Sequence, residues 1–409
     1  MAITPKLIST GPEAESRLRL AVVADATPVR EDIVSSGMTR LNTRVGEALL
    51  PWLQVFLAGT GRNYFQKSDV APALQPLTRL VHLPKFATRY AGRFVSWLRR
   101  DHVPWLLTLP WLARDLRARR VDWIFCPCGG NPEELEFVSA LARRAGVKLA
   151  LYLVDDFALG AELEGNQRLM QLARDRVPRR LGAADRLFSI SPGMQERLQR
   201  VYGLASTLLP LPYQAQPRAA LPTNDAATEV LFLGSMSHFY HGPLRQMAQA
   251  IDELNSELGT QLTLRFTLPG QGEAKRVLGD HACIRSSPLA DQPALARAVA
   301  SSLVCYAPYS FDAAQEEMVA CSFPSKLMDY LCHGRLVLVH SPAYGSAARY
   351  FREQGLPLIV TDADGAGLKS ALLAQLRQPQ DHHPLYRAAL AANHSYERFA
   401  ATVVQTLAS

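Results

Sequence analysis

Apolar runs of strand length alternate with helix-length amphipathic segments along the whole chain. Strands covered by helices on both faces are apolar throughout, so this alternation is typical of parallel sheets. In the first half the strand-like runs are residues 18–24, 121–127, 147–154 and 186–190. In the second half they are residues 230–234, 262–267, 303–307, 336–340 and 356–360. The pattern predicts an α/β fold with two doubly wound sheets.

A polar stretch rich in proline and alanine, residues 214–228, separates the two series and is the best candidate for a linker. The chain of 409 residues is also longer than most domains that fold around a single hydrophobic core. We therefore expect an N-terminal domain over residues 1–213 and a C-terminal domain over residues 229–383. We expect a last helix, residues 384–409, to cross back to the first domain.

Positive charge is concentrated in the first half of the chain. Residues 1–220 hold 30 Lys and Arg against 20 Asp and Glu, whereas residues 221–409 hold 14 against 17. Within residues 79–120 there are ten basic and two acidic side chains, with three tryptophans among them. Such a mixture suits an anionic membrane surface, and a helical pair with a solvated basic face explains it equally well. Nucleic acid is the least favoured partner, because no nucleic-acid-binding motif accompanies the charge.

No apolar run approaches the length of a membrane span, and residues 1–19 carry charges where a signal peptide needs an apolar stretch. We expect a cytoplasmic protein that can attach peripherally to the inner membrane. The six cysteines are scattered without zinc-ligand spacing. We therefore expect mostly buried thiols and no metal site.

The most specific pattern lies at residues 322–339, SFPSKLMDYLCHGRLVLV. It resembles the donor-site signature of bacterial glycosyltransferases of the GT-B type, P-S-K-[LI]-x-E-[YF]-x-x-x-G-[KR]-P-V. Residues 230–236 resemble the strand and turn that open the donor domain of that group, and residues 184–203 resemble the last strand and helix of its acceptor domain. The resemblance implies two Rossmann-like domains facing across a cleft, with the nucleotide sugar held by the C-terminal domain.

The residue types in this motif suit a nucleoside diphosphate leaving group. Developing negative charge needs backbone amides at a helix start and a cation, which Ser325 and Lys326 provide. One helical turn later, Asp329 is placed to accept hydrogen bonds from a ribose diol. These residues can replace a metal ion, so no metal or other cofactor is expected. A helix cap and a surface lysine are the alternative reading.

Two further segments are candidates for donor binding. Gly234 and Ser235 follow a strand and allow a close backbone approach to the phosphates, and Tyr309 ends another strand where it can frame the nucleobase. The large retaining group of these enzymes has Gly-Arg at the first turn and a glutamate where Cys321 stands here. The stereochemical outcome therefore stays open.

On the acceptor side, Asp155 and Asp156 end a strand and are expected to project into the cleft. Mutual repulsion and burial would raise the pKa of one of them, as a general base of an inverting enzyme requires. A pair that caps the next helix is the structural alternative. Gly37 precedes a helix and resembles the small-residue loop that approaches the reacting sugar.

These observations predict transfer of a sugar from a nucleotide sugar to a glycan or lipid-linked acceptor, in the assembly of a cell-surface polysaccharide. A sugar-nucleotide epimerase or phosphorylase of the same fold is the enzymatic alternative. A degenerate domain that acts as an assembly partner is the non-enzymatic one, because Ser235 and Cys321 stand where phosphate and sugar ligands are expected.

Overall fold

The computed structural model describes most of the chain. The described residues are 18–24, 26–30, 33, 37–59, 66–81, 103–129, 132–163, 167–214, 228–234, 236, 238–268 and 270–409. Nearly all of the predicted linker, Ser235, and residues 82–102 of the basic aromatic segment lie outside them.

The N-terminal sheet has seven strands in the order β3-β2-β1-β4-β5-β6-β7, and every pair of neighbours is parallel. The strands are β1 (Leu20–Ala24), β2 (Leu53–Gly59), β3 (Thr78–Val81), β4 (Trp123–Cys128), β5 (Lys148–Leu153), β6 (Arg186–Ser189) and β7 (Thr207–Leu208). All of β1 and β4 is buried, as their continuous apolar sequence requires.

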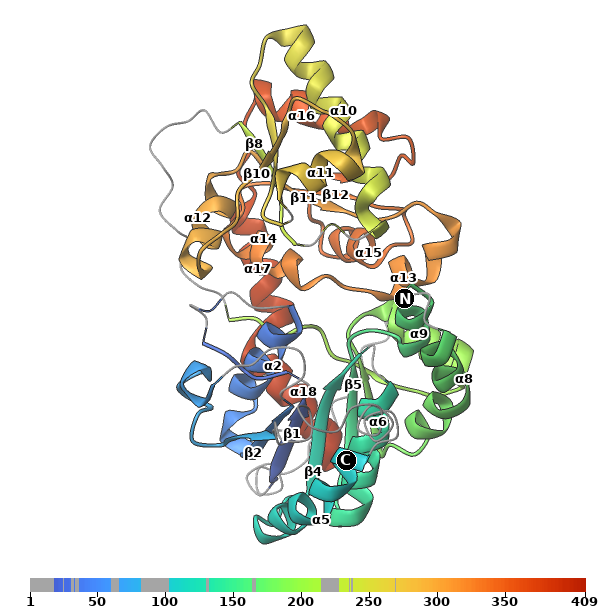
Figure 1. Cartoon of the computed structure of the whole chain (residues 1–409). Helices are drawn as coiled ribbons and strands as arrows, with labels where there is room; N and C mark the ends of the chain where they lie inside the picture. Colours follow the sequence, from blue (N-terminus) through green and yellow to red (C-terminus); the bar gives the residue numbers. More distant parts are fainter. Residues whose placement is uncertain are drawn as a thin grey trace, which may run out of the picture.

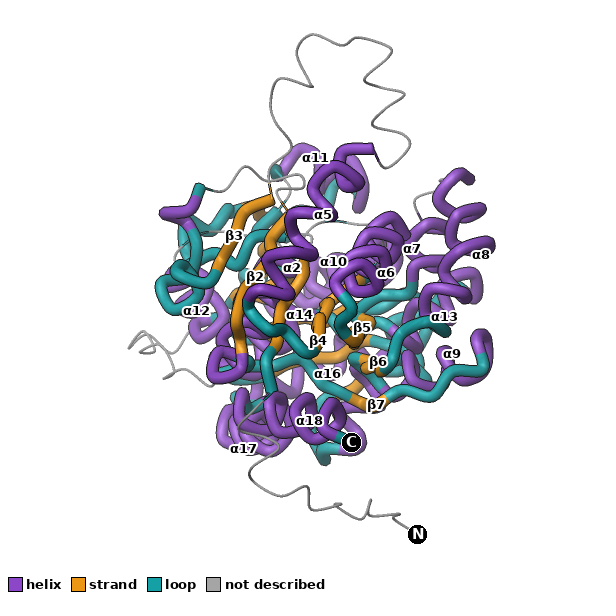
Figure 2. Tube along the Cα trace, turned by 90° about the horizontal axis from the view of Figure 1, so that it is seen from below, coloured by secondary structure: helices purple, strands orange, loops and turns teal. Residues whose placement is uncertain are grey.

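Helices connect these strands and cover both faces of the sheet. They are α2 (Gly37–Ala48), α5 (Val103–Ala118), α6 (Pro132–Ala145), α7 (Phe157–Leu163), α8 (Gln167–Leu181) and α9 (Pro192–Tyr202). Ser191 caps α9 by accepting a hydrogen bond from Met194 N–H, and Pro192 occupies the first turn. Figure 2 shows α5 and α6 on one side of the sheet and α18 on the other.

The C-terminal sheet repeats the arrangement with six parallel strands in the order β10-β9-β8-β11-β12-β13. They are β8 (Glu229–Phe232), β9 (Thr263–Phe266), β10 (Ile284–Ser286), β11 (Val304–Pro308), β12 (Val337–His340) and β13 (Ile359–Val360). The helices are α10 (His241–Leu258), α11 (Gln271–Leu278), α12 (Gln292–Ser301), α13 (Glu316–Cys321), α14 (Ser325–His333), α15 (Ser346–Glu353) and α16 (Ala366–Arg377). The strand order reverses between β8 and β11, where doubly wound sheets bind ligands.

The end of the chain forms two helices where the sequence pattern predicts one. Helix α17 (His383–His394) packs on α14, and α18 (Tyr396–Ala408) packs on α2 of the N-terminal domain, so the chain returns there (Figure 1). Ser395 divides them because its side chain accepts a hydrogen bond from Arg398 N–H and starts a new helix. In α18, Phe399 packs against Phe125 and Tyr152 of the N-terminal sheet.

All six cysteines are buried, and none forms a disulfide. Within the part of the chain that the structure describes, no helix is both long and apolar enough to cross a bilayer.

Candidate active site

The motif helix α14 presents Lys326 to the end of strand β8. Its Nζ lies 4.0 Å from the ring centre of Phe232, which ends β8, and 3.9 Å from that of Tyr240. The Lys326 side chain is half-buried, and the loss of water around its ammonium group lowers the pKa of Lys326 to about 7. Among the described residues, the ammonium has aromatic rings and no carboxylate as partners. A desolvated cation of this kind is stabilised by an incoming anion.

Gly234 forms the turn after β8, opposite Lys326. Its φ of 107° lies in the region that favours glycine, and a Cβ there would be 4.0 Å from Lys326 Nζ. Tyr330 of the motif joins this turn to α14, because its hydroxyl accepts a hydrogen bond from Leu233 N–H at 2.7 Å. The motif tyrosine thus links the middle of α14 to the turn after β8.

The N-terminal domain meets α14 at Gly37, where α2 begins. A Cβ at Gly37 would lie 2.6 Å from Ser325 Oγ, so a larger residue would displace the Ser325 hydroxyl. The positive ends of the two helix dipoles therefore converge beside Lys326, an arrangement that favours anions. The structure brings Gly37 close to Ser325 and Gly234 close to Lys326, and donor binding by these residues stays a prediction.

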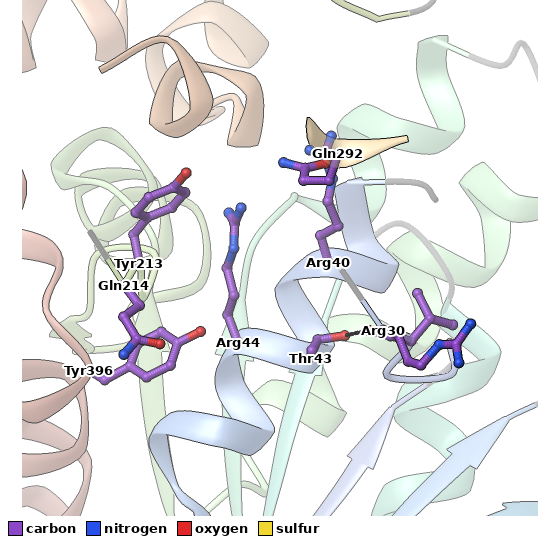
Figure 3. Close-up of a pocket in the computed structure, with 9 residues that line it drawn as sticks. Arg30, Arg40, Thr43, Arg44, Tyr213, Gln214, Gln292 and Tyr396 are labelled. Atoms are coloured by element: carbon purple, nitrogen blue, oxygen red, sulfur yellow. Dashed lines mark hydrogen bonds between the residues drawn. The ribbon is translucent and has the colours of Figure 1, made fainter. Parts of the chain in front are cut away.

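Asp329 is 1% exposed and pairs with two arginines of the other domain. Its Oδ2 accepts from Arg40 Nη1 at 2.8 Å, and its Oδ1 accepts from Arg44 Nη2 at 3.3 Å. Both oxygens are therefore engaged by α2, and the predicted ribose contact stays a prediction. The sequence analysis did not single out Arg40 and Arg44. They follow Gly37 and are four residues apart, a spacing that places both side chains on one face of a helix (Figure 3).

Asp155 and Asp156 have different surroundings. Asp155 is half-buried, and the described residues give its carboxylate no hydrogen bond. Burial, followed by the charge of Asp156, raises the pKa of Asp155 to about 6. Burial raises the pKa of Tyr240 to about 12, with a smaller contribution from Asp155. The charge of the Asp155 carboxylate in the N-terminal domain therefore acts on Tyr240 of the C-terminal domain, whose ring contacts Lys326.

Asp156 is buried and fully engaged. One oxygen accepts from Ala158 N–H and Leu159 N–H at 2.8 and 3.0 Å, which caps helix α7. The other accepts from Arg197 Nε at 2.8 Å and from Tyr202 Oη at 3.3 Å. These contacts fit the capping alternative for Asp156. Asp155 has the raised pKa that a general base needs, and its role as the base stays a prediction.

Tyr309 is buried beside Phe239, with 6.1 Å between ring centres, and its contact with a nucleobase stays a prediction. Tyr306 on β11 belongs to the core. Its hydroxyl donates to Pro243 O at 3.0 Å, and its ring stacks on His340.

Solved structures share this architecture over nearly their whole length. HepE of Anabaena in complex with UDP and glucose is 11% identical over 95% of this chain and 99% of its own, with a TM-score of 0.62. The trehalose-6-phosphate synthase OtsA is 13% identical over 95% and 98%, with a TM-score of 0.61. The lipopolysaccharide outer core galactosyltransferase WaaB is 11% identical over 93% and 97%, with a TM-score of 0.56.

The chain has the GT-B fold. No protein-family model matches the sequence, and no curated protein matches it either.

In this GT-B chain, helices α9 and α13 form a second contact between the domains. A Cβ at Gly193 would lie 1.8 Å from Ala320 O, so only glycine fits there. Ser191 Oγ donates to Cys321 O, and Cys321 Sγ donates to Gly193 O. Cys321, where the retaining group has a glutamate, is therefore enclosed in a domain contact, and burial raises its pKa to about 12.

An ion-pair network accompanies this contact. Arg197, which holds Asp156, also lies 2.6 Å from Glu317 of α13, and Arg200 pairs with the same carboxylate at 2.6 Å. Arg349 and Glu196 form a separate interdomain pair at 2.7 Å. The sequence offered no signal for the Arg197 link, because its partners lie 41 and 120 residues away.

Proposed function

We propose that this protein transfers a sugar from a nucleotide sugar to a hydroxyl group of a glycan or lipid-linked acceptor. The observation that carries the proposal is the surroundings of Lys326. A half-buried ammonium with aromatic partners lies where two helix starts and the Gly234 turn converge. A diphosphate would supply the missing counter-charge and accept hydrogen bonds from the helix amides.

In the proposed reaction the acceptor oxygen forms a bond to the anomeric carbon as the bond from that carbon to the diphosphate breaks. The leaving diphosphate takes the electron pair, and Lys326 with the amides at the start of α14 stabilises its charge. Asp155 takes the proton of the acceptor hydroxyl. Its pKa of about 6 leaves it mostly ionised at neutral pH yet basic enough to accept a proton. The proposal needs no divalent metal, since Lys326 and the amides perform that role.

For the acceptor we propose a substrate at an anionic membrane surface, in cell-surface polysaccharide assembly. Trp111 on α5 supports membrane attachment, because it lies in the basic segment 79–120 and is 56% exposed. Arg79 lies 5.4 Å from the ring centre of Trp111 and places a cation beside it. An exposed tryptophan next to a cation suits the interfacial region of a bilayer.

The test is a screen of radiolabelled UDP- and GDP-sugars with purified wild-type protein and Lys326→Ala. We expect wild type to bind UDP or GDP and to transfer or slowly hydrolyse one donor, and we expect Lys326→Ala to bind at least tenfold more weakly. Conversion of the donor to its epimer would identify the enzymatic alternative. Nucleotide binding with neither transfer nor hydrolysis would favour the assembly partner, and equal binding by both proteins would refute the donor site.

A further inference from the structure

Gly129 directly follows strand β4 and lies against Asp155, the proposed base. A Cβ at Gly129 would lie 2.8 Å from Asp155 N and 3.1 Å from Asp155 Cβ. It would also lie 2.9 Å from Cγ2 of Val154. Non-bonded carbon atoms normally stay about 3.5–4.0 Å apart. Two of the three crowded atoms are the amide nitrogen and the Cβ of the base, so they cannot rotate away from a new side chain.

The close contact, and not the backbone conformation, requires a glycine at this position. The φ angle of Gly129 lies outside the left-handed region that favours glycine, whereas the φ of Gly234 is 107°. The effect of an alanine at this position therefore comes from its methyl group. That group would push on Asp155 and Val154.

The backbone on either side of Asp155 is fixed by hydrogen bonds. Before it, Val154 N–H donates to Cys128 O at 3.0 Å, which extends the pairing of β4 with β5. After it, Asp156 caps α7 by accepting from two backbone amides at 2.8 and 3.0 Å. Because both neighbours are held, a new side chain at Gly129 displaces Asp155 itself.

We propose that Gly129 is a positioning residue that holds the Asp155 carboxylate at the carboxyl edge of the N-terminal sheet. Without a side chain at Gly129, the end of β4 packs directly on the backbone that carries the base. The steric contact stands by itself, whereas its effect on catalysis rests on the proposed function, in which Asp155 takes the acceptor proton. A displacement of about 1 Å can slow a reaction roughly 100-fold, so a small movement has a measurable effect.

The first test measures sugar transfer and UDP binding by Gly129→Ala. We expect kcat to fall at least tenfold, because the carboxylate is displaced, while the Kd for UDP stays unchanged. Gly272→Ala at the start of α11 is the matched control, because a Cβ there would meet no described atom within 4 Å. If Gly129→Ala unfolds in a circular-dichroism melt, Gly129→Ala combined with Val154→Ala replaces it, since the second substitution frees the space of Cγ2. A kcat equal to that of wild type overturns the proposal.

The second test follows the carboxylate without any sugar donor. Protein labelled with ¹³C at the aspartate side-chain carboxyls is titrated by NMR, and the Asp155 signal is identified by its loss in Asp155→Asn. We expect a pKa of about 6 for Asp155 in wild type. In Gly129→Ala this pKa should fall toward the ordinary value of 3.8, because a displaced carboxylate is more exposed to water. An unchanged pKa, even with a lower kcat, overturns the proposal, since a defect elsewhere would then explain the rate.

Together the two tests separate this proposal from the proposed function. A lowered pKa in Gly129→Ala combined with full activity of Asp155→Asn would support the placement of Asp155 by Gly129 and refute its role as the base. An inactive Asp155→Asn combined with a normal pKa and a normal rate in Gly129→Ala would support the base and overturn the positioning role of Gly129.

Discussion

Arg197 of α9 reaches into the opposite domain and contacts Glu317 of α13, with 2.6 Å between Nη1 and Oε2. The same guanidinium holds the buried carboxylate of Asp156. Asp156 is followed by helix α7 and preceded by Asp155, the proposed base. The contact between the domains is thus linked, through one side chain, to the backbone that carries the base.

We expect Glu317→Gln to lower kcat about three- to tenfold while leaving the Kd for UDP unchanged. The pair is partly exposed and is worth about 1 kcal/mol, and its loss loosens Arg197 and the Asp156 carboxylate. Glu196→Gln is the matched control, because it removes the other interdomain pair, which does not contact Asp156. Equal effects of the two substitutions on kcat would show that only domain closure matters.

Asp155→Asn should lower kcat at least 100-fold without weakening UDP binding, since a general base contributes that much or more. In wild type the rate depends on ionised Asp155. We therefore expect kcat/KM to rise with pH through about 6, the pKa of this carboxyl, and to fall again above about 7 as the free Lys326 ammonium loses its proton. The residual activity of Asp155→Asn should lack this rise. Full activity of Asp155→Asn would favour a retaining reaction without such a base.

The same substitution should stabilise the protein at neutral pH. The pKa of Asp155 in the folded state, about 6, lies above its ordinary value of 3.8, so the folded state binds this proton more tightly. The wild type therefore loses stability as pH rises from about 4 to about 6, by about 1–3 kcal/mol. Urea unfolding of Asp155→Asn should show a gain of that order at pH 7 and little at pH 4. An equal difference at both pH values would contradict the raised pKa.

Nucleotide binding should change the protonation of Lys326. With a pKa of about 7 the free ammonium is about half protonated at pH 7, and a bound diphosphate raises that pKa. Calorimetry in buffers of different ionisation enthalpy should show uptake of about half a proton per UDP at pH 7, relative to Lys326→Met. The difference should shrink toward zero at pH 6, where Lys326 is already protonated. A difference independent of pH would exclude Lys326 as the titrating group.

Membrane attachment should depend on the basic aromatic segment and on salt. Replacing Arg93, Arg99 and Arg100 with glutamine, together with Trp111→Ala, should release the protein from anionic vesicles in a sedimentation assay. Arg119 should be kept, because it pairs with Asp115 and donates to Gln54 O. A wild type that ignores anionic vesicles at low salt would leave the segment as a solvated surface.

The sequence predicted the fold well because most long strands are buried on both faces and read as apolar runs. It missed β2, β3, β7 and β10, and it missed the break at Ser395, where one capping side chain outweighs a continuous helical pattern. For the site, the local motif placed Ser325 and Lys326 at a helix start. Arg40, Arg44 and Arg197 act across domains, and their partners depend on tertiary packing that no local pattern encodes.

The return of α18 to the first domain also has a consequence for biosynthesis. Phe399 completes an aromatic cluster with Phe125 and Phe188 in the N-terminal sheet. At about 5–20 residues per second, the ribosome needs roughly 12–50 s after strand β5 before it has added Phe399. During that interval the apolar surface that α18 will cover on the first domain is exposed. Until Phe399 has been added, this aromatic cluster stays incomplete, and its apolar surface can contact other chains.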